Sequence, residues 1–129
     1  MTPKWLRKET ILILHAECLA EHGGLNGVRD VGLLESALER PINRNHYGEG
    51  DLFELAAEYA FGILRNHPFS DGNKRTGFLA ATTFLIINGW HLVAHEADAT
   101  LKTLALAAGD IGQSEYAEWL RTESQPVSS

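Results

Sequence analysis

The residues of this chain that are best suited to chemistry lie together at positions 67–75, in the order His-Pro-Phe-Ser-Asp-Gly-Asn-Lys-Arg. His67 can accept a proton near neutral pH. Asp71 provides a carboxylate that can bind Mg²⁺ beside a polyphosphate. Lys74 and Arg75 bring two positive charges that suit phosphate oxygens. This set of side chains in one short segment predicts a site for phosphoryl or nucleotidyl transfer.

The backbone of the same segment also predicts an anion site. A helix is expected to begin near Asn73, and the first amides of a helix point outward without an intrahelical partner, at the positive end of the helix dipole. Gly72 lets the backbone turn and approach an anion closely. Pro68, which directly follows His67, is expected to hold His67 in an extended conformation. The alternative is an ordinary turn in which Asp71 caps the helix, but two cations in a first helical turn oppose the dipole and therefore favour a bound anion.

Two apolar helices are expected to flank the segment and hold it. The first begins at Asp51, has Glu54 as its capping-box partner, and is apolar on almost every side as far as Leu64. The second covers about residues 73–87 and ends at the Asn-Gly pair at 88–89. Helices that are apolar all round are buried. We therefore predict an all-α fold, a compact helical bundle in which two buried central helices are joined by the active-site loop.

The other expected elements surround this central pair. In chain order they are an amphipathic helix over 8–21, a short helix from Asp30 to Arg40, a polar connector over 42–50, a helix over 97–108, a helix capped by Ser114 and a frayed tail over 123–129. Pro41 is expected to end the short helix, and residues 90–93 are too few to assign, with an extended strand as one option. On the first helix, Cys18 is expected to be a buried thiol, whereas His15 and His22 are interpreted as surface residues.

Composition narrows the class of protein. With 129 residues, the chain is expected to form one domain over residues 1–129. Its net charge of −6, from 11 Lys and Arg against 17 Asp and Glu, disfavours nucleic acid as a partner. The single cysteine excludes an internal disulfide, and no run approaches the roughly 18 apolar residues of a membrane span. We therefore expect a cytoplasmic protein that binds neither nucleic acid nor a membrane directly.

The residues of the segment resemble a known family. The Fic branch of the Fic/Doc family carries H-P-F-x-x-G-N-G-R-x-x-R, and its Doc branch carries H-x-F-x-[DN]-[AG]-N-K-R, which residues 67–75 match. Further stretches resemble landmarks of the Doc branch in the same order, namely Gly23-Gly24-Leu25, Asp51-Leu52-Phe53-Glu54, Asn73-Lys74-Arg75-Thr76 and Asn88-Gly89. The resemblance covers about residues 14–93, most of the chain, and implies the helical fold of that family.

The resemblance also implies a reaction. The Doc branch contains toxins of type II toxin–antitoxin pairs, which use ATP and Mg²⁺ to phosphorylate a threonine of elongation factor Tu and so inhibit translation. In the Fic branch, a glycine at the position of Lys74 leaves room for the diphosphate of ATP, and an arginine stands at the position of Phe78. Lys74 should obstruct that pose and favour one that presents the γ-phosphate for transfer. Gly72 is more typical of the Fic branch, so the first alternative is adenylyl transfer to a protein hydroxyl. The second alternative is a catalytically idle module that binds an antitoxin or a nucleotide.

The roles of the family transfer to this chain residue by residue. By resemblance, His67 would be the catalytic base, Asp71 would bind Mg²⁺ or orient the substrate, Gly72 and Asn73 would shape the anion cradle, and Lys74 and Arg75 would clamp the triphosphate. Phe69 is expected to face the core and anchor the loop. Arg44, Asn45 and Tyr47 stand where the family places a flap that positions the target protein, and a merely solvated loop is the alternative. A metal site at His91 and His95 is disfavoured, because their segment does not read as a helix.

Control by a second protein is also implied. Self-inhibited Fic proteins carry [ST]-x-x-x-E-[GN], and this chain has Ser114-x-x-x-Glu118 followed by Trp119, which fails the last position. The resemblance therefore implies inhibition in trans by a small Phd-like antitoxin whose tail folds on the toxin as a helix.

Overall fold

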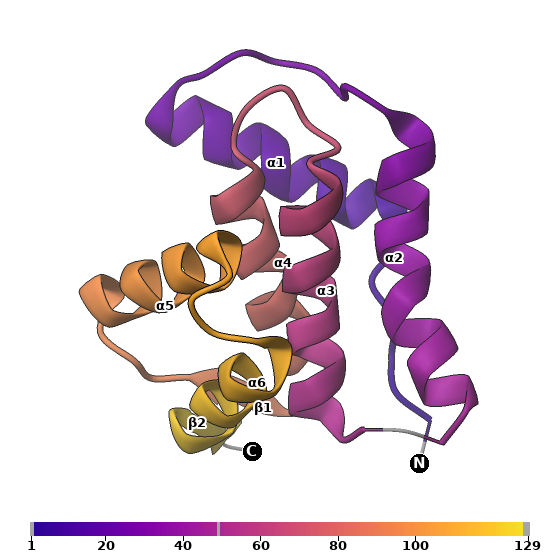
Figure 1. Ribbon diagram of the computed structural model, residues 1–129, viewed down its shortest axis with the longest axis vertical. Coiled ribbons are helices and arrows are strands. Elements are labelled where there is room, and N and C mark those ends of the chain that lie inside the picture. The colour runs from indigo at the N-terminus through magenta and orange to yellow at the C-terminus, as the bar shows by residue number, and fades with distance from the viewer. Residues whose placement is uncertain (1, 49, 128–129) are drawn as a thin grey trace.

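A computed structural model describes residues 2–48 and 50–127 of the chain (Figure 1). Within these residues the elements are α1 (Lys8–His22), α2 (Val31–His46), α3 (Leu52–Asn66), α4 (Asn73–Ile87), β1 (Trp90–Leu92), α5 (Glu96–Ala108), α6 (Gln113–Thr122) and β2 (Ser124–Pro126). The predicted all-α class is confirmed, with one small two-stranded sheet added to it. In the described part of the chain, no helix is long and apolar enough to cross a membrane.

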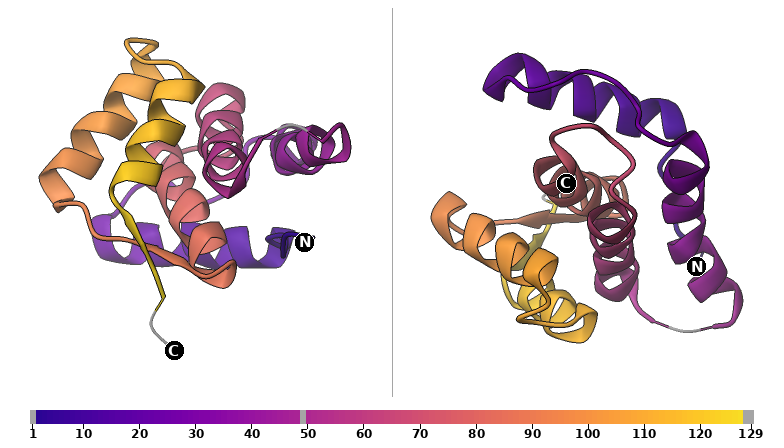
Figure 2. Two further views of the ribbon diagram at one scale, coloured as in Figure 1. Left: turned by 90° about the horizontal axis from the view of Figure 1, so that it is seen from below. Right: turned by 45° about the horizontal axis from the view of Figure 1, so that its top comes forward.

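The predicted central pair is α3 and α4. These helices pack against each other, α3 also contacts α2 and α6, and α4 also contacts α1. Figures 1 and 2 show α2 on one side of the pair, α5 and α6 on the other, and α1 across it. Gly77 allows the close approach, because a Cβ atom there would lie only 3.3 Å from the carbonyl oxygen of Ala60. The loop between the two helices is thus held at both ends by the most extensive contact between any two of the described elements.

Three predicted helix ends are confirmed. Asp51 and Glu54 form a complete capping box at the start of α3, with the Asp51 carboxylate accepting from the Glu54 amide at 2.9 Å. Asp30 caps α2 by accepting from the Leu33 amide at 3.0 Å. Asn88 ends α4. These polar residues satisfy helix-end groups that would otherwise lack partners.

The prediction that Pro41 ends the second helix is wrong. Pro41 lies inside α2, which continues through the expected connector as far as His46. A proline inside a helix removes one backbone hydrogen bond, but its ring is fully buried here. Beyond it, Arg44 forms ion pairs with Glu54 at 2.8 Å and Glu58 at 3.5 Å, both on α3. These contacts between helices stabilise the last turn of α2 and offset the lost hydrogen bond.

The C-terminal prediction needs two corrections. The helix α6 begins at Gln113 with Gly112 as its N-cap, so Ser114 lies inside the helix and does not cap it. The expected frayed tail is ordered up to Val127, because β2 pairs with β1 in an antiparallel register that sets Trp90 opposite Pro126. The Val127 amide extends this pairing by donating to the Gly89 carbonyl at 2.9 Å. Residues 128–129 of that predicted tail lie outside the described residues.

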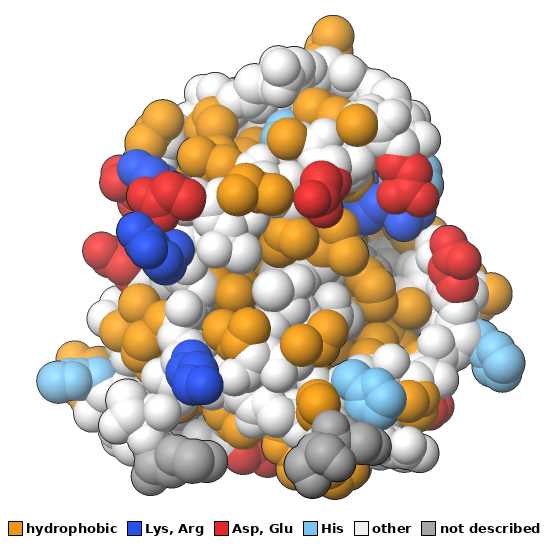
Figure 3. Space-filling model, turned by 180° about the vertical axis from the view of Figure 1, so that it is seen from behind, with side chains coloured by type: hydrophobic (Ala, Val, Ile, Leu, Met, Phe, Trp, Pro, Cys, Tyr) orange, Lys and Arg blue, Asp and Glu red, His pale blue; other side chains and the backbone are white. Residues whose placement is uncertain are grey.

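The surface carries mixed charge on the face seen from behind. Figure 3 shows most Lys and Arg side chains there beside Asp or Glu side chains, with hydrophobic side chains between the groups. Inside the molecule, Cys18 is 4% exposed, as predicted for a buried thiol. Burial raises the pKa of this thiol and outweighs the opposite effect of nearby Arg75. Cys18 is therefore a protonated core residue at neutral pH.

Candidate active site

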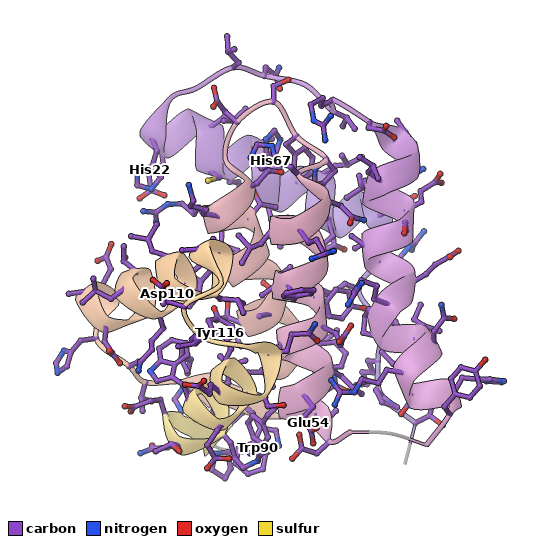
Figure 4. The ribbon with its side chains drawn as sticks, in the orientation of Figure 1. His22, Glu54, His67, Trp90, Asp110 and Tyr116 are labelled. Carbon is purple, nitrogen blue, oxygen red and sulfur yellow. The ribbon has the colours of Figure 1, made fainter. Side chains whose placement is uncertain are left out.

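The segment 67–75 forms the turn from α3 into α4, and we call it the signature loop (Figure 4). His67 ends α3 in a left-handed conformation, with φ of 51° and ψ of 55°. Among the described residues other than glycine, it alone has a positive φ. The prediction of an extended backbone at His67 is therefore wrong. A left-handed residue just after the last helical residue is a common way to end a helix and redirect the chain, and the His67 amide donates to the Ile63 carbonyl at 3.0 Å.

The connector between α1 and α2 braces the first half of the signature loop. Val28 forms an isolated antiparallel bridge with Phe69. The Pro68 carbonyl accepts two hydrogen bonds, at 2.7 Å from the Arg29 amide and at 3.1 Å from the Asp30 amide. The Arg29 side chain adds hydrogen bonds to the carbonyl oxygens of His67 at 2.8 Å and Asn66 at 3.0 Å. The backbone on which His67 stands is consequently held by residues far away in the sequence.

Asn73 ties the loop together from inside. Its side-chain oxygen accepts from the Phe69 amide at 3.0 Å, and its side-chain nitrogen donates to the Phe69 carbonyl at 2.9 Å. Asn73 is 3% exposed and Phe69 is completely buried. The expectation that Phe69 anchors the loop in the core is confirmed. Asn73 shapes the loop by fixing its backbone, because both ends of its amide are used within the loop.

His15 is the residue at this site that the sequence interpretation missed. The interpretation of His15 as a surface residue is wrong, because His15 is 4% exposed and its ring stacks on Phe69 with centroids 3.8 Å apart. Its Nε2 atom donates to the Asp71 carbonyl at 2.8 Å, since a carbonyl oxygen can only accept. The signal was present in the spacing: Ile11, His15 and Cys18 are the buried residues of α1, and they recur at helical intervals.

Asp71 joins the second half of the loop to the same connector. Its Oδ2 atom accepts from the Leu25 amide at 2.7 Å. The alternative in which Asp71 caps α4 is wrong, because Gly72 is the N-cap, with φ of 81°. Asp71 is exposed, and its Oδ1 atom has no hydrogen-bond partner within residues 2–48 and 50–127. One carboxylate oxygen therefore remains for a cation or a substrate.

The residues fit a Mg²⁺ ion that is shared with a polyphosphate. No group of three or more His, Cys, Asp or Glu side chains gathers within the described residues, so a cage made of protein alone is not present there. Mg²⁺ is commonly held by one or two carboxylates together with water and substrate phosphates. The free oxygen of Asp71 suits that mode of binding.

Lys74 and Arg75 occupy the first turn of α4, as predicted. Both are exposed, and neither forms an ion pair with a described residue. No acidic residue lies in that turn. Two cations therefore add to the positive end of the helix dipole. Both also line a cavity of about 560 Å³ that continues along α4, β1 and α5 past Phe78 and Leu104. The two cations attract an anion. The cavity beside them is lined further by Glu96 and by residues of α4, β1 and α5, and not by residues 67–73.

The predicted flap lies away from the signature loop. Arg44 binds Glu54, and Figure 4 shows Glu54 at the opposite end of α3 from His67. The length of helix between them corresponds to about 20 Å. The charge of Arg44 is taken up by its ion pairs, whereas Tyr47 is 78% exposed. The structure therefore does not bring residues 44–47 beside His67, and contact of this segment with a target protein stays a prediction.

Comparison with known proteins agrees with the geometry of the site. Residues 5–85 match the model of the Fic/DOC family. The protein kinase doc of Escherichia phage P1 is 38% identical over 114 residues, which cover 88% of this chain and 90% of the phage protein. The toxin Doc of Mycolicibacterium smegmatis is 47% identical over 75 residues, which cover 56% of this chain and 57% of that toxin. Both the family match and the two alignments thus concern most or more than half of the chain.

Proposed function

The chain belongs to the Fic/DOC family, and we propose that it acts as a Doc-type toxin whose activity is that of a protein kinase. The names and extent of the two relatives support this function. The structural observation that carries it is the first turn of α4. Lys74 and Arg75 stand there without acidic partners among the described residues, and a rigid loop joins them to His67.

The proposed reaction transfers the γ-phosphoryl group of ATP to a hydroxyl of a protein. The hydroxyl oxygen forms a bond to the γ-phosphorus while the bond from that phosphorus to the bridging oxygen of ADP breaks. His67 takes the proton of the hydroxyl, which is the role of a general base. Lys74, Arg75 and the first amides of α4 hold the phosphate oxygens and stabilise the charge that moves to ADP. Mg²⁺, when bound through Asp71 and the phosphates, would neutralise part of the same charge.

The proposed acceptor is a threonine of elongation factor Tu, so that translation is inhibited. The Doc-like sequence of the loop supports a threonine acceptor by resemblance alone. The exposure of His67 supports a macromolecular acceptor, because its imidazole stands at the surface and not at the bottom of a closed pocket. A hydroxyl on an exposed segment of another protein can therefore reach it.

Inhibition in trans by a small antitoxin is part of the same proposal. A toxin named as such among the relatives supports an antitoxin partner, and a Phd-like protein is the kind we expect. Within the chain, Glu118 pairs with Arg121 on the same helix, α6, and forms no ion pair with Lys74 or Arg75. With no acidic partner of their own among the described residues, Lys74 and Arg75 leave an opening for a carboxylate supplied by another protein.

Adenylyl transfer is the rival reaction at the same site. Gly72 favours it by resemblance to the Fic branch, and Lys74 disfavours it. The side chain of Lys74 stands at the anion site, where a Fic protein has only a hydrogen atom. Kinase activity is therefore the better supported reaction.

The test is to incubate the purified chain with elongation factor Tu, Mg²⁺ and ATP, and to measure the intact mass of the factor. His67→Asn is the control variant. A gain of one phosphoryl group, lost with the variant, would support the proposal. A gain of one adenylyl group would overturn the kinase in favour of adenylyl transfer, and label from α-labelled ATP would verify it. No gain with elongation factor Tu, but phosphorylation of another protein in a bacterial lysate, would overturn the target only.

A further inference from the structure

We propose that Arg29 is a positioning residue for His67, acting through the backbone at the end of α3. The inference rests on the proposed kinase function and adds a residue to it from outside the signature loop. Arg29 lies on the connector between α1 and α2, 38 positions before His67 in the chain. Its Nε atom donates to the His67 carbonyl at 2.8 Å, and its Nη2 atom donates to the Asn66 carbonyl at 3.0 Å.

The two acceptors are carbonyl groups at the end of a helix. The last carbonyls of a helix lack intrahelical partners and carry the negative end of the helix dipole. A guanidinium group is planar and holds two acceptors in a fixed geometry, with charge-assisted hydrogen bonds. Together with the Arg29 and Asp30 amides, which both donate to Pro68, this clamp holds three successive carbonyl groups. The peptide planes on both sides of His67 are thereby fixed.

The hydrogen bonds from Arg29 stabilise a residue whose backbone conformation is unfavourable. His67 has a φ of 51°, and the left-handed conformation is sterically unfavourable for a residue with a Cβ atom. This conformation sets the direction of the Cα–Cβ bond of His67. His67 is exposed, and its imidazole makes no hydrogen bond within the described residues. The backbone is therefore the part of His67 that its neighbours hold by hydrogen bonds, and Arg29 holds it directly.

Arg29 is suited to this role because it does little else. Its side chain is exposed, and it forms no ion pair with any residue in 2–48 or 50–127. Its side-chain hydrogen bonds both go to the last residues around the end of α3. Removing it should therefore affect the placement of His67 more than the fold. The anion site should also be spared, because Lys74 and Arg75 stand on α4 beyond the Asn73 tie.

The experiment compares Arg29→Ala and Arg29→Lys with the control Arg65→Ala. Arg65 is likewise an exposed arginine beside the end of α3, because it lies in the last turn of that helix. Its guanidinium lies 5.9 Å from the centroid of the Phe61 ring, and it donates to no carbonyl among the described residues. We expect Arg29→Ala to lower kcat by about 10- to 100-fold, the range in which a misplaced catalytic group costs rate, with KM for ATP within about twofold of the unmodified chain. Arg29→Lys should recover only part of kcat, because an ammonium group cannot reproduce the planar fork. Arg65→Ala should change neither.

A second comparison separates positioning from general damage. In the His67→Asn background, Arg29→Ala should lower the residual rate by less than about twofold, because the group that it positions is already gone. A full additional loss in that background would overturn the proposal. So would equal effects of Arg29→Ala and Arg65→Ala, or a rise in KM without a fall in kcat.

A readout without catalysis keeps this inference distinct from the proposed function. The heteronuclear NOE of the His67 amide reports how ordered that backbone is. Arg29→Ala should lower it clearly, whereas Arg65→Ala should leave it unchanged. If the chain transferred no phosphoryl group at all, the proposed kinase function would be wrong. The NOE measurement would still decide whether Arg29 orders the backbone of His67. An unchanged NOE in Arg29→Ala would overturn the positioning role.

Discussion

Two polar segments of this molecule, the signature loop and residues 44–47, differ in whether their cations form ion pairs. In the signature loop, hydrogen bonds hold the backbone of residues 67–71, through Asn73 and His15 on one side and the α1–α2 connector on the other. Its cations, Lys74 and Arg75, have no ion-pair partners in the described part of the chain. In the other segment, Arg44 is paired with Glu54 and Glu58.

The signature loop therefore has the properties of a binding site, whereas residues 44–47 include a cation that stabilises the contact between two helices. A surface cation that is already paired contributes to the packing of its helix, as Arg44 does where α2 meets α3. Unpaired cations at the start of a helix repel one another and the helix dipole, so they are unfavourable until an anion arrives. A rigid backbone beneath them keeps that unfavourable arrangement in place. Polar residues in a sequence therefore indicate a site only when their charges remain available in the fold.

The largest expected effect is the loss of the base. His67→Asn should lower phosphoryl transfer by about 10²- to 10⁴-fold, the usual contribution of a general base. Thermal stability should stay nearly unchanged, because asparagine tolerates the left-handed conformation that His67 adopts. Transfer rates and unfolding temperature of the variant and the unmodified chain test this. A variant that retained full activity would show that the loop binds phosphate without His67 as its base.

The tie inside the loop should matter for folding. Asn73→Ala removes two hydrogen bonds and leaves the buried amide and carbonyl of Phe69 without partners. We expect a loss of about 2–3 kcal/mol in the free energy of unfolding, measured by urea denaturation. Asn66→Ala is the matched control, since its side chain makes one such bond, to the Leu33 carbonyl at 2.9 Å. An equal effect of both substitutions would contradict the special place of Asn73.

The unpaired cations should contribute to the binding of ligand and not to the free energy of unfolding. Lys74→Ala should weaken binding of Mg·ATP by about tenfold, an effect that shrinks as salt screens the charge. The free energy of unfolding should stay constant or rise by about 0.3–1 kcal/mol, because the cation opposes the dipole of α4. Calorimetric titration and urea denaturation measure the two quantities, with Lys102→Ala on α5 as the control. A stability loss in Lys74→Ala would mean that this charge has a structural partner.

The paired cation should show the reverse behaviour. Arg44→Ala leaves Glu58, whose side chain is only 9% exposed, with a single ion pair to Arg40. We expect a loss of about 1 kcal/mol in the free energy of unfolding and unchanged binding of Mg·ATP. Tyr47→Ala, at an exposed position, should leave both quantities unchanged. If Tyr47→Ala lowered phosphorylation of the target protein, with stability and binding of Mg·ATP unchanged, the prediction that residues 44–47 contact the target would be supported. A normal rate of phosphorylation would contradict that prediction.

Much of the site was predictable because its residues are neighbours in the chain. The order His67, Asp71, Gly72 and the two cations requires no knowledge of the fold to indicate phosphate chemistry. The central helices were predictable too, since apolar side chains on every face leave burial as the favourable state. Capping residues such as Asp30 and Asp51 act within one helical turn, so their effect is local and readable.

What the sequence by itself determined was thus the chemistry of the loop and the two helices that carry it, because both depend on residues close in the chain. Only the tertiary structure decided the left-handed backbone of His67, the burial of His15 and the passage of α2 through Pro41. It also decided that Arg44 is paired and that β2 is ordered. All of these involve a partner in another segment, and some partners are far along the chain: His15 and Asp71 are separated by 56 positions, and Arg29 and His67 by 38. Local pattern carries no record of such partners, because folding alone brings them within hydrogen-bond distance.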